Sequence, residues 1–267
     1  MQTLLDNRIN RLLADKSQNK LSIYFTAGFP ALNDTRTILM ALQEAGADMV
    51  EIGIPFSDPV ADGPTIQASN QKALENGMTL RLLFEQLEGI REGVDMPLIL
   101  MGYLNPVVQF GMEAFCKEAA RVGIDGLIIP DLPLAEYERQ YKGLFESYGL
   151  KFICLITPQT SEARIRQIDA LSDSFIYMVS SAATTGAKQG VSNEQIQYFE
   201  RVNAMNLRNP KVVGFGISDA DSFRTVGQYA EGAIIGSAFI RMLESSTSLK
   251  ADILRFIQSI KVNSSNL

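Results

Sequence analysis

The chain has 267 residues, 46% of them hydrophobic and 20% charged, and its formal net charge at pH 7 is −6. This length is large for one ordinary domain but within the range of a single α/β barrel, and the apolar fraction suits a substantial core. The mild acidic balance offers no basic surface to nucleic acid, and no apolar run approaches the ~18 residues of a membrane span.

The chain contains two cysteines and no histidine. Cys116 lies in a helical pattern and Cys154 in a strand-like run, so both are predicted to be structural thiols, and nothing indicates an oxidising compartment. Without imidazole a usual zinc shell cannot form, and we expect no metal in this chain. Acid–base chemistry near neutral pH must therefore use carboxylates, tyrosine, lysine or cysteine.

The N-terminal segment predicts a short amphipathic helix, since Leu4, Leu5, Ile9 and Leu12 recur at helical spacing. It contains no apolar stretch followed by a cleavage site. We therefore expect a cytoplasmic protein.

Eight short apolar runs follow, separated by amphipathic helical patterns. Near-continuous apolar strands that alternate with helices are typical of parallel strands covered by helices. Three helical patterns end at Gly46, Gly123 and Gly149, just before the next run, as helix C-termini prefer. The predicted strands are residues 21–26, 49–54, 97–102, 126–131, 151–157, 175–180, 211–217 and 232–237.

These strand–helix units predict a (β/α)8 barrel (a TIM barrel) of the α/β class, in which residues 1–267 form a single domain with a short N-terminal helix. The main alternative is a doubly wound open sheet, which usually carries a G-x-G-x-x-G turn after its first strand. The first predicted strand is followed by "AGFPALNDT", which lacks that turn. The barrel is therefore favoured.

The second predicted strand leads into a loop rich in carboxylates, "EIGIPFSDPVADGPTIQ" (51–67). Alternation places Glu51 inside the barrel, where an ionised carboxylate is costly unless it is paired or used. A satisfied structural glutamate and a functional one both fit this position. Asp58 and Asp62 are typical turn formers, and capping of a helix that begins near Thr65 is a further structural role.

Two glycine-rich strand ends predict a phosphate site. The seventh predicted strand ends in "GFGIS" (214–218), and the eighth ends in Gly236 and Ser237 and runs directly into "AFIRML". Barrels commonly hold phosphate after strands 7 and 8, where glycine exposes backbone N–H groups and a helix begins. The long loop 180–194 after the sixth strand is either a plain surface connection or a lid over the substrate.

Several of these segments are recognisable together: "VEIGIPFSDPVADGPTIQ", "YLNPV", "GIDGLIIPDLP", "TTGAK", "GFGIS" and "IIGSAFI". In this order, and over nearly the whole chain, they closely resemble the tryptophan synthase alpha subunit family. The resemblance implies a barrel lyase of tryptophan biosynthesis that splits indole-3-glycerol phosphate into indole and glyceraldehyde 3-phosphate. It also implies an α2β2 complex in which indole passes to a pyridoxal-phosphate β subunit, with no cofactor in this chain.

The resemblance also implies a role for each matching residue. Glu51 matches the acid–base carboxylate, and Asp62 matches the carboxylate that partners the indole N–H. Substrate-binding positions match Tyr24, Met101, Tyr177, Thr185, Gly186, Gly214, Gly216, Gly236 and Ser237. A partner interface is expected at Pro55, Asp58, Pro59, Asn105 and Pro133. In the lid many members carry Ser-Arg-x-Gly-Val-Thr-Gly, whereas this chain has "SSAATTG" (180–186), without the Arg and the first Gly.

Other functions remain open at this stage. A stand-alone lyase that releases free indole would use the same pocket. A phosphate-binding regulatory scaffold without catalysis is disfavoured because Glu51 and Asp62 are both present. Another phosphate-binding barrel, such as a sugar-phosphate isomerase, would not explain the loop after the second strand.

Overall fold

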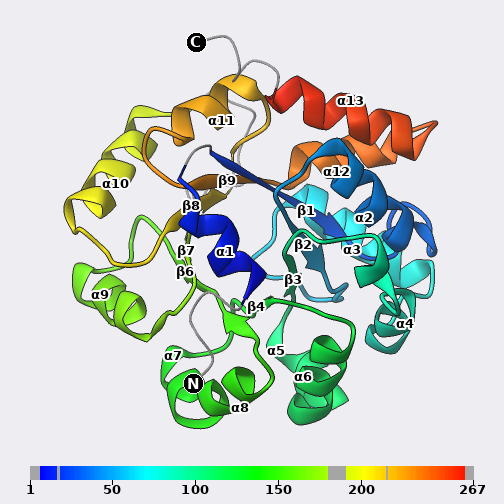
Figure 1. Cartoon of the computed structure of the whole chain (residues 1–267), viewed down its shortest axis with the longest axis horizontal. Coiled ribbons are helices and arrows are strands. Elements are labelled where there is room, and N and C mark those ends of the chain that lie inside the picture. Colours follow the sequence, from blue (N-terminus) through cyan, green and yellow to red (C-terminus); the bar gives the residue numbers. More distant parts are fainter. Residues whose placement is uncertain (1–6, 17–18, 180–190, 215, 262–267) are drawn as a thin grey trace.

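The computed structural model describes residues 7–16, 19–179, 191–214 and 216–261. In these residues one parallel sheet curls into a barrel, and helices form a ring around it (Figure 1). The predicted (β/α)8 architecture is confirmed, and the open-sheet alternative is wrong because the sheet closes on itself. That the whole chain makes up a single domain stays a prediction.

Neighbouring strands of the barrel pair in parallel, in the order β5-β4-β3-β2-β1-β9-β8-β7-β6. Every predicted strand has a counterpart, although several end earlier than predicted because their last residues belong to the loops. The strands are β1 (Lys20–Thr26), β2 (Met49–Gly53), β3 (Leu98–Met101), β4 (Gly126–Ile128), β5 (Lys151–Phe152), β6 (Cys154–Ile156), β7 (Ile176–Val179), β8 (Lys211–Gly214) and β9 (Gly232–Ile235).

The barrel closes through the segment predicted as one strand at 151–157. β5 pairs with β4 and β6 pairs with β7, and a single residue, Ile153, separates them. The Ile153 N–H still donates to the Leu127 carbonyl at 2.9 Å, so the segment changes neighbours without leaving the barrel. Strands of a barrel are tilted and staggered against one another, so the first part of this segment can pair with β4 while its last part pairs with β7.

Helices follow most strands and cover the outside of the barrel (Figure 1). The predicted helix ends are confirmed at Gly46, Gly123 and Gly149, each with a positive φ between 71° and 83°. The helices are α1 (Arg8–Ala14), α2 (Asp34–Ala45), α3 (Pro64–Glu75), α4 (Leu80–Gln86), the 3₁₀ turn η2 (Ile90–Glu92), α5 (Leu104–Phe110), α6 (Met112–Arg121), α7 (Leu134–Glu136), the π turn η3 (Tyr137–Tyr141), α8 (Lys142–Ser147), α9 (Glu162–Leu171), α10 (Asn193–Ala204), α11 (Ala220–Val226), α12 (Ser237–Glu244) and α13 (Leu249–Lys261).

Helix α1 lies across the end of the barrel at which the strands begin (Figure 1). Asn7 caps this helix and donates from Nδ2 to the Asp125 carbonyl, just before β4, at 2.9 Å. Ile9 is fully buried and packs against Gly126, where an added Cβ would lie 2.8 Å from it. The predicted N-terminal helix is confirmed from Arg8 onward, and the earlier part of the pattern lies outside the described residues. Helix α1 therefore covers part of the N-terminal end of the barrel, and the loops that follow the strands lie at the opposite end.

None of the described helices combines the length and the apolar character that a bilayer crossing needs.

Candidate active site

Glu51 lies on β2, fully buried inside the barrel. Ser22 on β1 donates from Oγ to Glu51 Oε1 at 3.2 Å, while Oε2 is buried without a hydrogen-bond partner among the described residues. Burial raises the pKa of Glu51 to about 8, although the Ser22 bond lowers it. At neutral pH the side chain is therefore mostly a carboxylic acid with one oxygen unused. This arrangement differs from a satisfied structural glutamate and suits a proton donor.

Asp62 ends the loop between β2 and α3, and Tyr103 holds it. The Tyr103 hydroxyl donates to Asp62 Oδ2 at 3.2 Å and accepts from the Ala61 N–H at 3.0 Å. Burial raises the pKa of Asp62 to about 6, and the Tyr103 bond opposes that rise. The group is thus mostly ionised at neutral pH. The helix-capping alternative is wrong, since α3 begins at Pro64 and its N-cap, Gly63, accepts no side-chain capping bond.

Two buried tyrosines lie close to both carboxylates. Burial raises the pKa of Tyr24 and of Tyr177 far above the usual value, and the negative charges of Asp62 and Glu51 raise both further. The phenols therefore stay protonated and are hydrogen-bond donors. The Tyr24 hydroxyl lies over Gly53, as the Tyr177 hydroxyl lies over Gly214, and a Cβ at either glycine would overlap it. Gly214 thus makes room for a side chain of the site, and a contact with substrate there stays a prediction.

A chain of buried hydroxyls connects Tyr24 to helix α3. The Tyr24 Oη lies 3.5 Å from Thr26 Oγ1, which lies 2.7 Å from Ser69 Oγ. Ser69 donates its proton to the Ile66 carbonyl at 2.8 Å. Because a hydroxyl has one proton, Thr26 donates to Ser69 and accepts from Tyr24. The orientation of Tyr24 is therefore linked to the helix that follows Asp62.

The two predicted phosphate loops lie side by side, because β8 and β9 pair in the sheet. Gly216 has φ +78° in the loop after β8, and Gly236 and the exposed Ser237 begin α12 directly after β9. The helices that follow differ. Asp219 caps the N-terminus of α11 by accepting from the backbone N–H of Ser222 at 2.8 Å, whereas Gly236 leaves α12 without a side-chain cap. An anion is therefore better accommodated at α12 than at α11.

The remaining predicted substrate contacts are placed only in part. Met101 ends β3, half-buried and opposite Gly53 in the strand register. Thr185 and Gly186 in the expected lid lie outside the described residues.

The residues expected at a partner interface differ in accessibility. Asp58, Asn105 and Pro133 are exposed, in the loops or helix starts that follow β2, β3 and β4. Pro55 and Pro59 are buried in the chain itself, where they fix the course of the β2–α3 loop. A role of these five residues in binding a partner stays a prediction.

Two polar contacts at the site were not predicted from the sequence. Ser22 lies two residues before Tyr24, and strand alternation would have placed both on the inner face of β1. Tyr103 lies two residues after the end of β3 and begins the recognisable "YLNPV" segment, which was the available signal. The sequence did not indicate which carboxylate either hydroxyl would reach.

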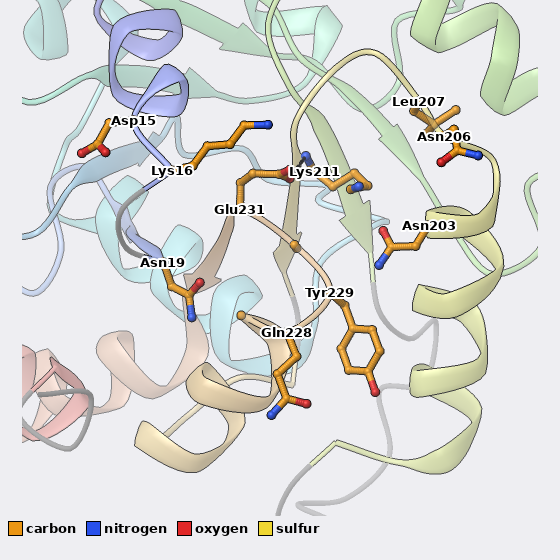
Figure 2. Close-up of a pocket in the computed structure, with 12 residues that line it drawn as sticks. Asp15, Lys16, Asn19, Asn203, Asn206, Leu207, Lys211, Gln228, Tyr229 and Glu231 are labelled. Carbon is orange, nitrogen blue, oxygen red and sulfur yellow. Dashed lines mark hydrogen bonds between the residues drawn. The ribbon is translucent and has the colours of Figure 1, made fainter. Parts of the chain in front are cut away.

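A cavity of about 440 Å³ opens at the other end of the barrel (Figure 2). Its lining includes Asn19 before β1, Lys211 at the start of β8 and Glu231 before β9. Because these residues precede or begin their strands, the cavity lies at the N-terminal end of the barrel, away from the two carboxylates. In barrels of this kind that end serves stability rather than chemistry.

Within the described part of the chain, no group of three or more His, Cys, Asp or Glu side chains could hold a metal ion. Burial raises the pKa of both Cys116 and Cys154 to about 12, so the thiols stay protonated. Protonated, buried thiols are neither nucleophiles nor metal ligands, which is consistent with structural cysteines.

Comparisons with known proteins decide the family. A family model described as the tryptophan synthase alpha chain matches residues 11–265. The chain is 57% identical over 255 residues to the tryptophan synthase alpha chain of Flavobacterium johnsoniae, covering 96% of this chain and 100% of that relative.

The chain belongs to the tryptophan synthase alpha chain family.

Solved structures agree with this assignment. A tryptophan synthase alpha chain from Legionella pneumophila superposes with a TM-score of 0.87 at 30% identity, over 98% of this chain and 99% of that one. A chain of the tryptophan synthase complex from Pyrococcus furiosus superposes with a TM-score of 0.82 at 32% identity, over 90% and 97%. Membership of the tryptophan synthase alpha chain family confirms the expected activity, a lyase reaction of tryptophan biosynthesis that cleaves indole-3-glycerol phosphate to indole and glyceraldehyde 3-phosphate.

Proposed function

We propose that Glu51 and Asp62 carry out this cleavage as a pair with opposite protonation states. The observation that carries the proposal is the difference between their pKa values, about 8 for Glu51 and about 6 for Asp62. Near pH 7 the first is mostly an acid and the second mostly a carboxylate. Two titratable groups whose environments separate their pKa values are the usual basis for assigning acid and base roles.

Each group then has a distinct task. Glu51 donates its proton to C3 of the indole ring, and Asp62 accepts a hydrogen bond from the ring N–H and stabilises the positive charge that develops there. The Glu51 carboxylate next removes the proton of the hydroxyl on the glycerol carbon attached to the ring. As that oxygen becomes the aldehyde, the carbon–carbon bond breaks and its electron pair returns to the ring. Glu51 is protonated again, and indole and glyceraldehyde 3-phosphate are released.

The phosphate of the substrate would bind at the start of α12. The uncapped N–H groups at Gly236 and the exposed hydroxyl of Ser237 support this position, because a helix N-terminus favours an anion. Gly216 supplies a further backbone N–H from the adjacent loop. Tyr24, Tyr177 and Met101 would line the indole part of the pocket.

Release of indole by the purified chain tests the two carboxylates. Glu51→Gln and Asp62→Asn should each lower kcat by on the order of 10²–10⁴-fold, because a positioned acid or base contributes about that much. Glu113→Gln, on the outside of the barrel in α6, is the matched control and should turn over like the parent chain. Near-parental turnover of Glu51→Gln would remove Glu51 from the mechanism.

We further propose that the chain works in the cytoplasm in an α2β2 complex with a tryptophan synthase β subunit, which would hold the pyridoxal phosphate and consume the indole. The family assignment and the exposed positions of Asp58, Asn105 and Pro133 support this proposal. A stand-alone lyase that releases free indole is the outcome that would contradict it. Co-purification with a β subunit, followed by turnover with and without it, separates the two.

A further inference from the structure

The two oxygens of the Glu51 carboxylate have different surroundings. Oε1 accepts the hydrogen bond from Ser22 Oγ, and Oε2 is buried without a hydrogen-bond partner among the described residues. Ser22 is itself fully buried on β1. In the strand register Tyr24 lies opposite Glu51 and Ser22 lies opposite Met49. The serine therefore reaches the carboxylate from the inward-facing position nearer the start of the strands.

We propose that Ser22 is a positioning residue for the cleavage reaction: it holds Glu51 by Oε1 and leaves Oε2 as the oxygen that exchanges protons with the substrate. This inference rests on the proposed role of Glu51. In the proposed mechanism Glu51 first gives its proton to C3 and then takes the proton of the glycerol hydroxyl, so one oxygen has to reach an acceptor atom and then a donor atom. A fixed hydrogen bond to the other oxygen limits rotation of the carboxyl group between these two steps.

The Ser22 bond also affects the acidity of Glu51. A hydroxyl that donates to a carboxylate stabilises the charged form, so it lowers the pKa that burial raises. Tyr24 from β1 and Tyr177 from β7 lie close enough to Glu51 for its charge to raise their pKa values, and the charge of Asp62, in the loop after β2, raises both as well. Both tyrosines stay neutral, and Asp62 does not stabilise a second negative charge. Removal of the Ser22 hydroxyl should therefore raise the pKa of Glu51 further.

The pH dependence of cleavage tests this inference. In the proposed mechanism free enzyme needs protonated Glu51, so the alkaline limb of kcat/KM reports its pKa. Ser22→Ala should move that limb up by about one pH unit and lower kcat by on the order of tenfold, with KM little changed. Ser22→Thr keeps the hydroxyl and should restore the parental limb, and Ser22→Cys, a weaker donor of similar size, should fall between.

A direct titration makes the test independent of turnover. Infrared difference spectra between the parent chain and Glu51→Gln isolate the carboxyl band of Glu51, whose intensity can be followed as pH changes. The same pair of spectra recorded in the Ser22→Ala background should show that this band titrates with a midpoint at higher pH. Ser174→Ala is the matched control, because Ser174 is a buried serine in the segment just before β7, at the opposite end of the barrel. Ser174→Ala should leave both the alkaline limb of kcat/KM and the titration midpoint of the Glu51 carboxyl band unchanged.

The outcomes separate this inference from the proposed function. If Glu51→Gln is inactive but Ser22→Ala keeps the parental limb and the parental band midpoint, Ser22 does not position Glu51. If Glu51→Gln retains turnover, the role of Glu51 itself is wrong. If Ser22→Ala does not fold, the intermediate shift expected for Ser22→Cys decides, and a parental limb in that variant overturns the inference.

Discussion

At the scale of single residues, Glu51 combines function with a cost in stability. Its pKa is about 8 in the folded chain against 4.5 for an ordinary glutamate. Between these values the unfolded chain has lost the proton that the folded chain keeps, so unfolding releases a proton and the free energy of unfolding falls as pH rises. Above pH 8 both states are ionised and the loss is complete. The burial of Glu51 therefore costs the least free energy of folding at low pH.

Glu51→Gln should therefore stabilise the chain, and by more at pH 8.5 than at pH 5. The expected gain is a few kcal/mol at most, since one pKa unit corresponds to about 1.4 kcal/mol. Urea unfolding of both chains at the two pH values measures it, and Glu113→Gln again serves as control. An equal effect at both pH values would mean that Glu51 is not buried as an acid.

The hydroxyl of Tyr103 should keep the pKa of Asp62 lower than burial alone would set it. Tyr103→Phe removes the hydroxyl that donates to Asp62, so the pKa of Asp62 should rise above its value of about 6. Because Asp62 acts as a carboxylate, the acid limb of kcat against pH should move to higher pH, with kcat near pH 7 reduced about tenfold. Tyr229→Phe changes a tyrosine at the opposite end of the barrel and should leave the profile alone. An unmoved acid limb in Tyr103→Phe would contradict this assignment.

At the scale of elements, the two helices after β8 and β9 have different tasks. The side chain of Asp219 occupies the N-terminus of α11, and hydrogen bonds from Ser222 lower its pKa. The N-terminus of α12 has no such side chain. A helix start that is already capped contributes to folding, whereas an uncapped one at the mouth of the barrel can accept an anion.

Substitutions at these two helix starts should therefore separate binding from stability. Gly236→Val should raise KM more than it lowers kcat, because phosphate contacts are made in both the ground and the transition state and the added methyl groups crowd the N–H groups. Asp219→Ala should leave KM unchanged and destabilise the chain by about 1 kcal/mol, the usual cost of a lost cap. Steady-state kinetics and thermal unfolding measure the two effects. An unchanged KM in Gly236→Val would count against the phosphate site at α12.

At the scale of the whole molecule, the loops after β2, β3 and β4 form the surface that we expect a β subunit to contact. Asp58 and Val60 in the first loop are exposed, Val60 to 87%. The same loop carries Asp62, so a partner that binds it preferentially in one arrangement would favour a productive site. We expect acceleration of cleavage by the partner through this link.

Addition of the β subunit should accelerate cleavage by roughly 5–150-fold, which corresponds to a coupling of about 1–3 kcal/mol. Asn105→Arg should weaken the complex, whereas Gln228→Arg, at the opposite end of the barrel, should not. Thr185→Val should reduce the acceleration while the complex still forms. Titration of the chain with β subunit, followed by indole release, measures all three. Full turnover of the isolated chain would favour the stand-alone lyase.

Much of this molecule could be predicted from its sequence, because the spacing of apolar residues along a strand or helix indicates which of its faces is buried. Apolar runs separated by amphipathic patterns predicted the barrel, glycines after the helical patterns predicted where helices end, and alternation along β2 placed Glu51 inside. Resemblance to a family then supplied the activity. These features depend on residues that are close together in the chain, so a single sequence displays them.

The tertiary structure alone decided which groups meet. Ser22 and Glu51 are 29 residues apart, and Tyr103 and Asp62 are 41 apart, yet each pair forms a hydrogen bond. The change of neighbours at Ile153 is likewise a consequence of barrel closure. These distances depend on the order, stagger and tilt of the strands, which local sequence periodicity does not predict. The acidity of Glu51 and Asp62 follows from the same cause, because burial and hydrogen-bond partners exist only once the barrel has closed.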